Sequence, residues 1–162
     1  MRKQLLALLF GIVALGIALP AGATERIRCE VLSIEASTAG RGVDPALSAA
    51  LGRHAGVLSK PPFAGFDSFR LESRRPYELE VGKAVDLTLP RPFGGRLTAP
   101  GRDGARFELI LDIVRPGASP VRIQGKASPG TPLFAAGFAG PGGTWIFGVI
   151  CDLIATAGII QH

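Results

Sequence analysis

The chain has 162 residues, of which 47% are hydrophobic and 19% charged, and its formal net charge is +5. This composition is too apolar and too weakly charged for a disordered chain, and the 22 glycines and 13 prolines follow no triplet period of the collagen kind. The length fits one compact domain and excludes two full ones.

The N-terminal segment, residues 1–23, has the parts of a secretory signal peptide. Arg2 and Lys3 form a positive start, Leu5 to Leu19 are an unbroken apolar run, and small residues follow as far as Ala23. We expect cleavage after Ala23, with retention of the segment as an anchor as the alternative. The mature domain would then span residues 24–162 in the periplasm or outside the cell. Its net charge of +3 gives little support to nucleic-acid binding.

The first predicted strand covers residues 26–36, and its apolar side chains change phase. Odd-numbered apolar residues up to Val31 fall on one face, whereas even-numbered ones from Leu32 onward fall on the other. An extra residue in a β-bulge near Val31 accounts for such a change. One helix is predicted next, near residues 44–54, because Asp44 can cap its free amides and Pro45 suits the first helical position.

Alternating side chains predict strands over 68–73, 77–81 and 85–89, the last two joined as a hairpin. In that hairpin Glu80 faces Asp86, and Glu78 lies two residues along on the same side. Three carboxylates at this spacing suit a glycosidase pair or a calcium ligand set. The alternative is an ordinary solvated outer face, softened by nearby basic side chains.

Arginines crowd the segment that follows, between residues 90 and 106, with Phe93 among them. Guanidinium groups match phosphates, acidic glycans and lipid head groups. Arg91, Arg96 and Arg102 are therefore a candidate anion-binding set. The alternative is a solvated connection between strands, since Asp103 interrupts the patch.

Two hairpins are predicted in the C-terminal half. Residues 106–114 alternate strictly between apolar and polar side chains, and pairing them with 121–126 places Asp112 opposite Arg122 and Glu108 opposite Lys126. The second hairpin joins 133–136 to 144–151 through a Gly-rich turn. Its last strand is apolar on both faces, which predicts a central position.

Cys29 and Cys151 are the only cysteines, one near each end of the predicted domain. In an oxidising compartment they predict a disulfide, with two buried free thiols as the alternative. The apolar tail from Ala155 to Ile160 is a candidate contact with a partner or a membrane surface. We expect no transmembrane span here, because the stretch is short and Asp152 would be costly in hydrocarbon.

Together these segments predict an all-β fold, an antiparallel β-sandwich or a small barrel, with one short helix. No recognisable catalytic motif occurs, and neither of the two histidines, His54 and His162, is paired with a nucleophile by a known pattern. We therefore predict no catalytic residue, no metal site and no cofactor.

Four short motifs carry a resemblance. They are "GVDPAL" at 42–47, "FDSFRL" at 66–71, Leu89-Pro90, and "FAGPGGT" at 138–144. In these motifs the chain resembles uncharacterised secreted β-rich proteins of myxobacterial type. The resemblance implies a small envelope β-domain and assigns no site residue.

The expected function is that of a non-enzymatic interaction or structural module in the periplasm or at the cell surface. Its partner would be an envelope protein or another cell-surface component, and not nucleic acid. Two alternatives remain open: a binder of anionic glycan or lipid through the arginines, and a hydrolase, carboxylate-based or metal-dependent, built on Glu78, Glu80 and Asp86.

Overall fold

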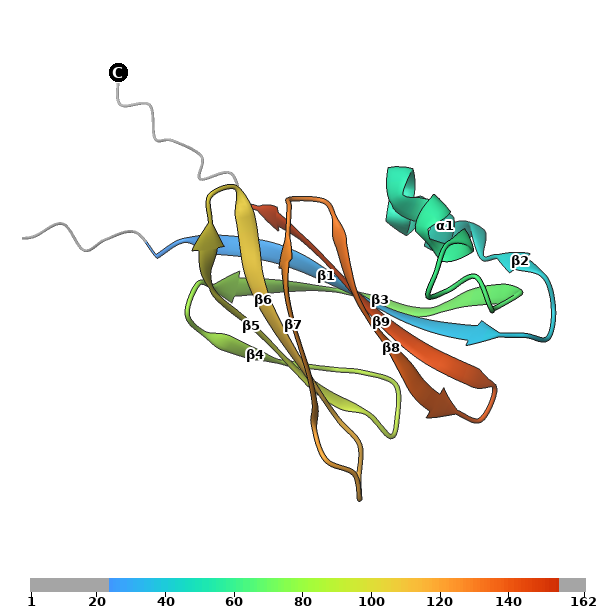
Figure 1. Cartoon of the computed structure of the whole chain (residues 1–162). Helices are drawn as coiled ribbons and strands as arrows, with labels where there is room; N and C mark the ends of the chain where they lie inside the picture. Colours follow the sequence, from blue (N-terminus) through green and yellow to red (C-terminus); the bar gives the residue numbers. More distant parts are fainter. Residues whose placement is uncertain (1–23, 155–162) are drawn as a thin grey trace, which may run out of the picture.

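The computed structural model describes residues 24–154, so the predicted signal peptide and the apolar tail from Ala155 lie outside it. Two β-sheets face each other, and a short helix lies over the end of one sheet that extends beyond the other (Figure 1). The larger sheet has the order β2-β3-β1-β9-β8 and the smaller one the order β4-β5-β6-β7. The predicted sandwich is confirmed, whereas the small barrel is wrong, because the two sheets do not close on each other in the described chain.

The strands and helices have these bounds: β1 Arg26–Ser37, β2 Gly42–Val43, α1 Pro45–Leu51, the 3-10 helix η1 Gly52–Ser59, β3 Ser68–Glu80, β4 Ala84–Leu87, β5 Gly94–Asp103, β6 Arg106–Val114, β7 Val121–Ala127, β8 Pro132–Gly140 and β9 Gly143–Leu153. Neither helix in residues 24–154 is long and apolar enough to cross a membrane.

The main core lies between the sheets and follows from strand alternation. In β6 the four odd-numbered apolar residues from Phe107 to Ile113 are buried, while the intervening side chains are partly exposed. The predicted β6–β7 hairpin is confirmed in its register, with Asp112 opposite Arg122 and Glu108 opposite Lys126. The final hairpin is confirmed as well, and β9 lies centrally between β1 and β8.

A second core lies on the other face of the five-stranded sheet, beneath the helices. Leu47, Leu51 and Leu58 pack there against even-numbered residues of β1 such as Leu32 and Ile34. The helix begins as predicted, since one carboxylate oxygen of Asp44 accepts a hydrogen bond from the Ala46 N–H at 2.8 Å. Its other oxygen accepts from the Leu71 N–H at 3.2 Å, which ties the start of the helix to β3.

The two cores explain why β1 changes phase, and the bulge expected near Val31 is wrong. β1 pairs with β9 without a break from Ile27 to Ala36. The apolar side chains from Ile27 to Val31 point toward the other sheet, and those from Leu32 to Ala36 point toward the helix. The alternation is therefore unbroken, and no extra residue is needed in β1. The extra residue is Glu72 in β3, where the register shifts between the pairs Ser33–Ser73 and Ile34–Leu71.

The hairpin expected over 77–89 is also wrong, because β3 and β4 belong to different sheets. The Val81 N–H donates to the Glu25 carbonyl, and the Gly82 N–H donates to the Ala99 carbonyl. The chain therefore passes from one sheet to the other at this turn. Each strand still points alternate apolar residues into the core, so its local pattern is that of a half-buried strand in either arrangement.

The disulfide predicted between Cys29 and Cys151 is confirmed. The two residues lie directly opposite each other in β1 and β9, 122 positions apart in the chain. Both are 0% exposed and belong to the core between the sheets. The bond thus joins the first strand of the domain to its last.

Ser33 is the one buried polar residue of the described core, at 1% exposure, and its hydroxyl has no hydrogen-bond partner there. Burying an unpaired hydroxyl is unfavourable, so we expect Ser33→Ala to raise the free energy of unfolding by about 1 kcal/mol. Urea unfolding measures the change, with Ser73→Ala, on the half-buried partner in β3, as a control expected to stay within about 0.5 kcal/mol. A clear loss of stability in Ser33→Ala would contradict this reading of the hydroxyl.

Candidate functional site

The three carboxylates predicted as a possible site do not share one environment, because the hairpin that would join them does not form. Glu78 pairs with Arg28 at 3.4 Å, and Asp86 pairs with Arg96 at 2.8 Å on the other sheet. Glu80 pairs with Arg26 at 3.7 Å and with Lys83. Each carboxylate thus has a basic partner. Within residues 24–154, no group of three His, Cys, Asp or Glu side chains is placed to hold a metal ion.

The charge state of Glu80 follows from these partners. The hydrogen bond and the charge of Lys83 lower the pKa of Glu80 below its usual value, and the charge of Arg26 adds to this. A general acid needs the opposite shift, since it must hold a proton near neutral pH. The arrangement around Glu80 therefore favours a surface ion pair.

The three candidate arginines do not form one patch, because Arg96 and Arg102 lie on opposite faces of the smaller sheet and Arg91 lies in a connection. Arg96 stands opposite Asp112 on the outer face, whereas Arg102 stands opposite the buried Phe107, with its guanidinium 5.5 Å from the centre of that ring. A bulge in β5 between Thr98 and Gly101 causes this reversal. Arg96 is paired with Asp86, as above, and Arg102 with Glu25 at 2.6 Å. Arg91 lies exposed in the β4–β5 connection.

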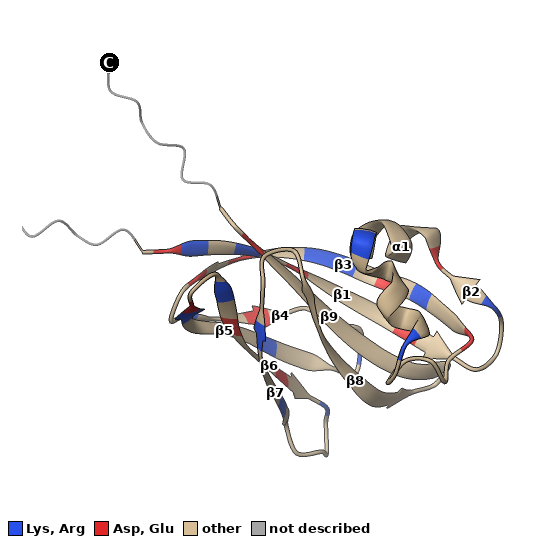
Figure 2. Cartoon of the chain, turned by 45° about the horizontal axis from the view of Figure 1, so that its top comes forward, with Lys and Arg blue, Asp and Glu red and all other residues tan. Residues whose placement is uncertain are grey.

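Charged side chains form a continuous row across the outer face of the smaller sheet. Asp86, Arg96, Asp112 and Arg122 come from β4, β5, β6 and β7, and each stands directly opposite the next. Arg122 Nε donates to Asp112 Oδ1 at 2.7 Å, and Arg96 Nε donates to Asp86 Oδ1 at 2.8 Å. Figure 2 shows the same interspersion of the two signs over the strands. Alternating charges satisfy one another, which favours a role in strand register.

The row gives stability that depends on pH. The hydrogen bond from Arg122 lowers the pKa of Asp112, whose side chain is only 17% exposed. A lowered folded-state pKa means that the stabilisation is full above the ordinary carboxyl pKa of about 4 and is lost as the pH falls below it. We expect Asp112→Asn to lower the free energy of unfolding by about 1 kcal/mol at neutral pH, with the difference shrinking as the pH falls below about 4.

Urea unfolding at several pH values measures this dependence. Asp152→Asn is the matched control, because Asp152 is exposed and has no ion pair within the described residues. A pH-independent loss in Asp112→Asn would contradict the ionic origin of the effect.

A different site lies on the side of the sandwich where β7 and β8, the edge strands of the two sheets, run next to each other. At one end of this seam Leu133 of β8 packs onto Gly125 of β7, where a Cβ would collide with it. At the other end the seam opens into a pocket of about 340 Å³, which we call the seam pocket. Its lining residues are Ile113, Arg115, Ala118, Ser119, Val121, Ala136, Gly137, Phe138 and Ala139.

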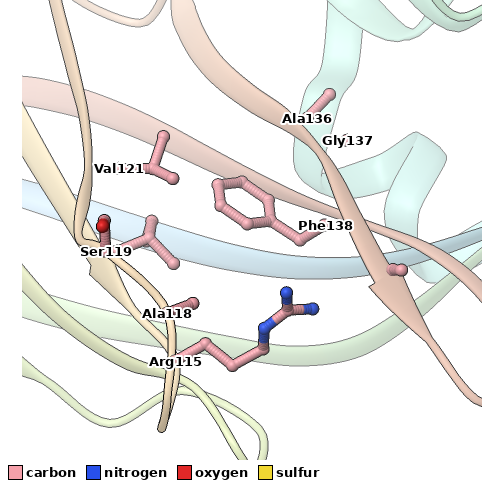
Figure 3. Close-up of a pocket in the computed structure, with 9 residues that line it drawn as sticks. Arg115, Ala118, Ser119, Val121, Ala136, Gly137 and Phe138 are labelled. Atoms are coloured by element: carbon pink, nitrogen blue, oxygen red, sulfur yellow. The ribbon is translucent and has the colours of Figure 1, made fainter.

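The seam pocket is mainly apolar. Ile113 of β6 is buried beneath it, while Val121 at the start of β7 is 46% exposed. Val121 and Phe138 point toward each other across the pocket, and Arg115 reaches from the β6–β7 turn toward β8 (Figure 3). Ser119 supplies one hydroxyl. The pocket therefore combines an apolar interior with one guanidinium at its rim.

A bulge in β8 positions Phe138. The β8–β9 register shifts between Ala136 and Phe138, so Gly137 is the extra residue, and its φ of 97° is in the range that glycine tolerates best. The shift turns Phe138 to the same side as Ala135, toward the core. There its ring lies 5.4 Å from that of Phe147 and 6.0 Å from that of Phe93, centre to centre. These rings support the pocket from within.

None of the pocket residues belongs to the sites predicted from the sequence. Residues 115–119 resemble an ordinary turn, and the seam forms only when the edges of two sheets meet. The one local signal is the break in alternation around Gly137. No protein family, curated protein or solved structure matches this chain. Its function is therefore inferred from the geometry of the described residues.

Proposed function

We propose that the protein is an exported, non-enzymatic interaction module of the cell envelope, which binds a partner protein at the seam between β7 and β8. The observation that carries the proposal is the seam itself: an apolar pocket lies there between two strand edges that pair with no further strand in residues 24–154. Strand edges and exposed apolar surface are features that protein partners bind.

Export is supported by the signal-peptide pattern of residues 1–23 and by the buried disulfide. Disulfides persist in the periplasm and outside the cell and are rare in the cytosol. The ion pairs around the carboxylates and around two of the arginines favour the module over a hydrolase or a binder of anionic glycans or lipids.

Chemical cross-linking of native cell envelopes, followed by mass spectrometry, tests the proposal. We expect one envelope protein to be enriched with this chain relative to an unrelated exported domain. The intact mass from the same sample should correspond to a chain that begins at Thr24 and lacks two hydrogens for the disulfide. Recovery of the intact chain without any enriched partner would contradict an interaction role, and a chain that retains residues 1–23 would contradict cleavage.

A further inference from the structure

The geometry of the seam pocket points to a more specific partner, and this inference rests on the proposed function. We infer that the pocket receives an extended peptide segment of the partner, with one bulky apolar side chain inside the pocket and, two residues along on the same side, a carboxylate on Arg115. The segment would lie along an open strand edge at the seam.

The strand edges favour an extended segment. β8 pairs only with β9, and β7 pairs only with β6, so each has one row of backbone N–H and C=O groups without a strand partner in the described chain. An added strand satisfies such groups through main-chain hydrogen bonds, whatever its sequence. Side-chain pockets beside the edge then select the peptide, because alternate side chains of an added strand point to the same side.

The size and lining of the pocket favour one large apolar side chain. Its volume of about 340 Å³ is near the lower limit of ligand pockets, about 300–1,000 Å³. Phe138 and Val121 present carbon atoms on opposite sides. Ile113, which is buried, also lines the pocket. The aromatic rings behind Phe138 hold this wall in place, so an incoming side chain meets a preformed surface.

The charge at the rim favours a carboxylate. Arg115 is the only charged residue that lines the pocket, and it has no ion pair within residues 24–154. Arg122, seven positions on, is by contrast held by Asp112. A guanidinium group binds a carboxylate through two parallel N–H donors. Ser119, elsewhere in the lining, supplies a hydroxyl. An acidic residue two positions from the apolar one, on the same side of the strand, would complete the site.

Peptide binding to the folded domain, residues 24–162, tests the inference by fluorescence anisotropy. The probe is a fluorescein-labelled hexapeptide, Thr-Val-Phe-Thr-Asp-Thr with an amidated end, in which Phe and Asp point to the same side of an extended strand. Three matched probes replace Asp by Asn, replace Phe by Ser, or carry N-methyl groups on the backbone that block strand pairing. We expect the first probe to bind and each of the others to bind about tenfold more weakly, the effect of losing a charge-assisted hydrogen bond or a buried aromatic group.

Two protein variants complete the design. Arg115→Gln should weaken binding of the Asp probe about tenfold and leave binding of the Asn probe unchanged. The substitution in the protein and the Asp-to-Asn change in the probe remove the same interaction, so their effects should not add. Arg75→Gln should leave the binding of both probes unchanged, because Arg75 is exposed and lies in β3, away from the seam. Any one of four results would overturn the inference. The Asp probe could fail to bind the folded wild type, could bind no more tightly than the Asn probe or the N-methylated probe, or could bind Arg115→Gln as tightly as the wild type.

The outcome is distinguishable from failure of the proposed function. If an envelope protein is enriched by cross-linking while no probe binds, the proposed interaction role is supported and the peptide inference is contradicted. If the protein enriched at this seam is a second copy of the same chain, the peptide inference is overturned in favour of self-association. If no partner is enriched, the interaction role itself is contradicted.

Discussion

Replacing both cysteines in Cys29→Ala/Cys151→Ala is expected to lower the free energy of unfolding by about 4–5 kcal/mol. The bond closes a loop of 122 residues, almost the whole described domain, and so restricts the unfolded chain strongly. It also joins β1 to β9, the two adjacent strands around which the larger sheet is built. Because a small domain is stable by only about 5–15 kcal/mol, this loss leaves the variant marginal.

Urea unfolding of the oxidised wild type and the double variant measures the difference. Cys29 and Cys151 are both 0% exposed. A reductant should therefore reach their sulfur atoms only after the domain unfolds. We therefore expect dithiothreitol to leave the folded wild type oxidised and to reduce it in urea. Rapid reduction under native conditions, or a loss below about 1 kcal/mol in the variant, would contradict a buried bond that supports the fold.

Phe147→Ala is expected to lower the free energy of unfolding by about 3–5 kcal/mol, the range for removing a fully buried ring. Phe147 is 0% exposed, and its ring lies 5.4 Å from those of Phe93 and Phe138 and 6.3 Å from that of Trp145. Its removal leaves a cavity at the centre of this aromatic cluster. The cavity is close to the seam pocket, because Phe138 lines both.

Two controls separate cavity formation from a general effect of substitution. Phe147→Leu conserves most of the volume and should cost less than about 1.5 kcal/mol. Phe66→Ala, at a half-buried ring that contacts Phe69 on the helix side, should cost less than Phe147→Ala. Equal losses in Phe66→Ala and Phe147→Ala, measured by urea unfolding, would show that the aromatic cluster has no special weight.

The strand pattern predicts this fold well where contacts are local. The β6–β7 hairpin was predictable because both its apolar alternation and its opposite charges agree on one register. The disulfide was predictable because two cysteines in an apolar context leave one pairing. The helix start at Asp44-Pro45 is likewise encoded by adjacent residues.

The errors arise where a choice is non-local. Strands β3 and β4 have the same alternation whether they pair or face each other across the core, so the sequence could not separate these arrangements. The bulges at Glu72 and Gly137 depend on the partner strand and leave little local trace. The seam pocket combines a turn of one sheet with the edge of the other, which is why its residues escaped prediction.

Site-specific photo-cross-linking in intact cells tests the central proposal, partner binding at the seam, most directly. A photo-reactive phenylalanine derivative would replace Val121 in the pocket or, as the control, Arg75 on the far side of the larger sheet. The account predicts a covalent adduct with one envelope protein from position 121 and none from position 75. Adducts from position 75 alone, or none from a folded and exported chain at either position, would contradict it.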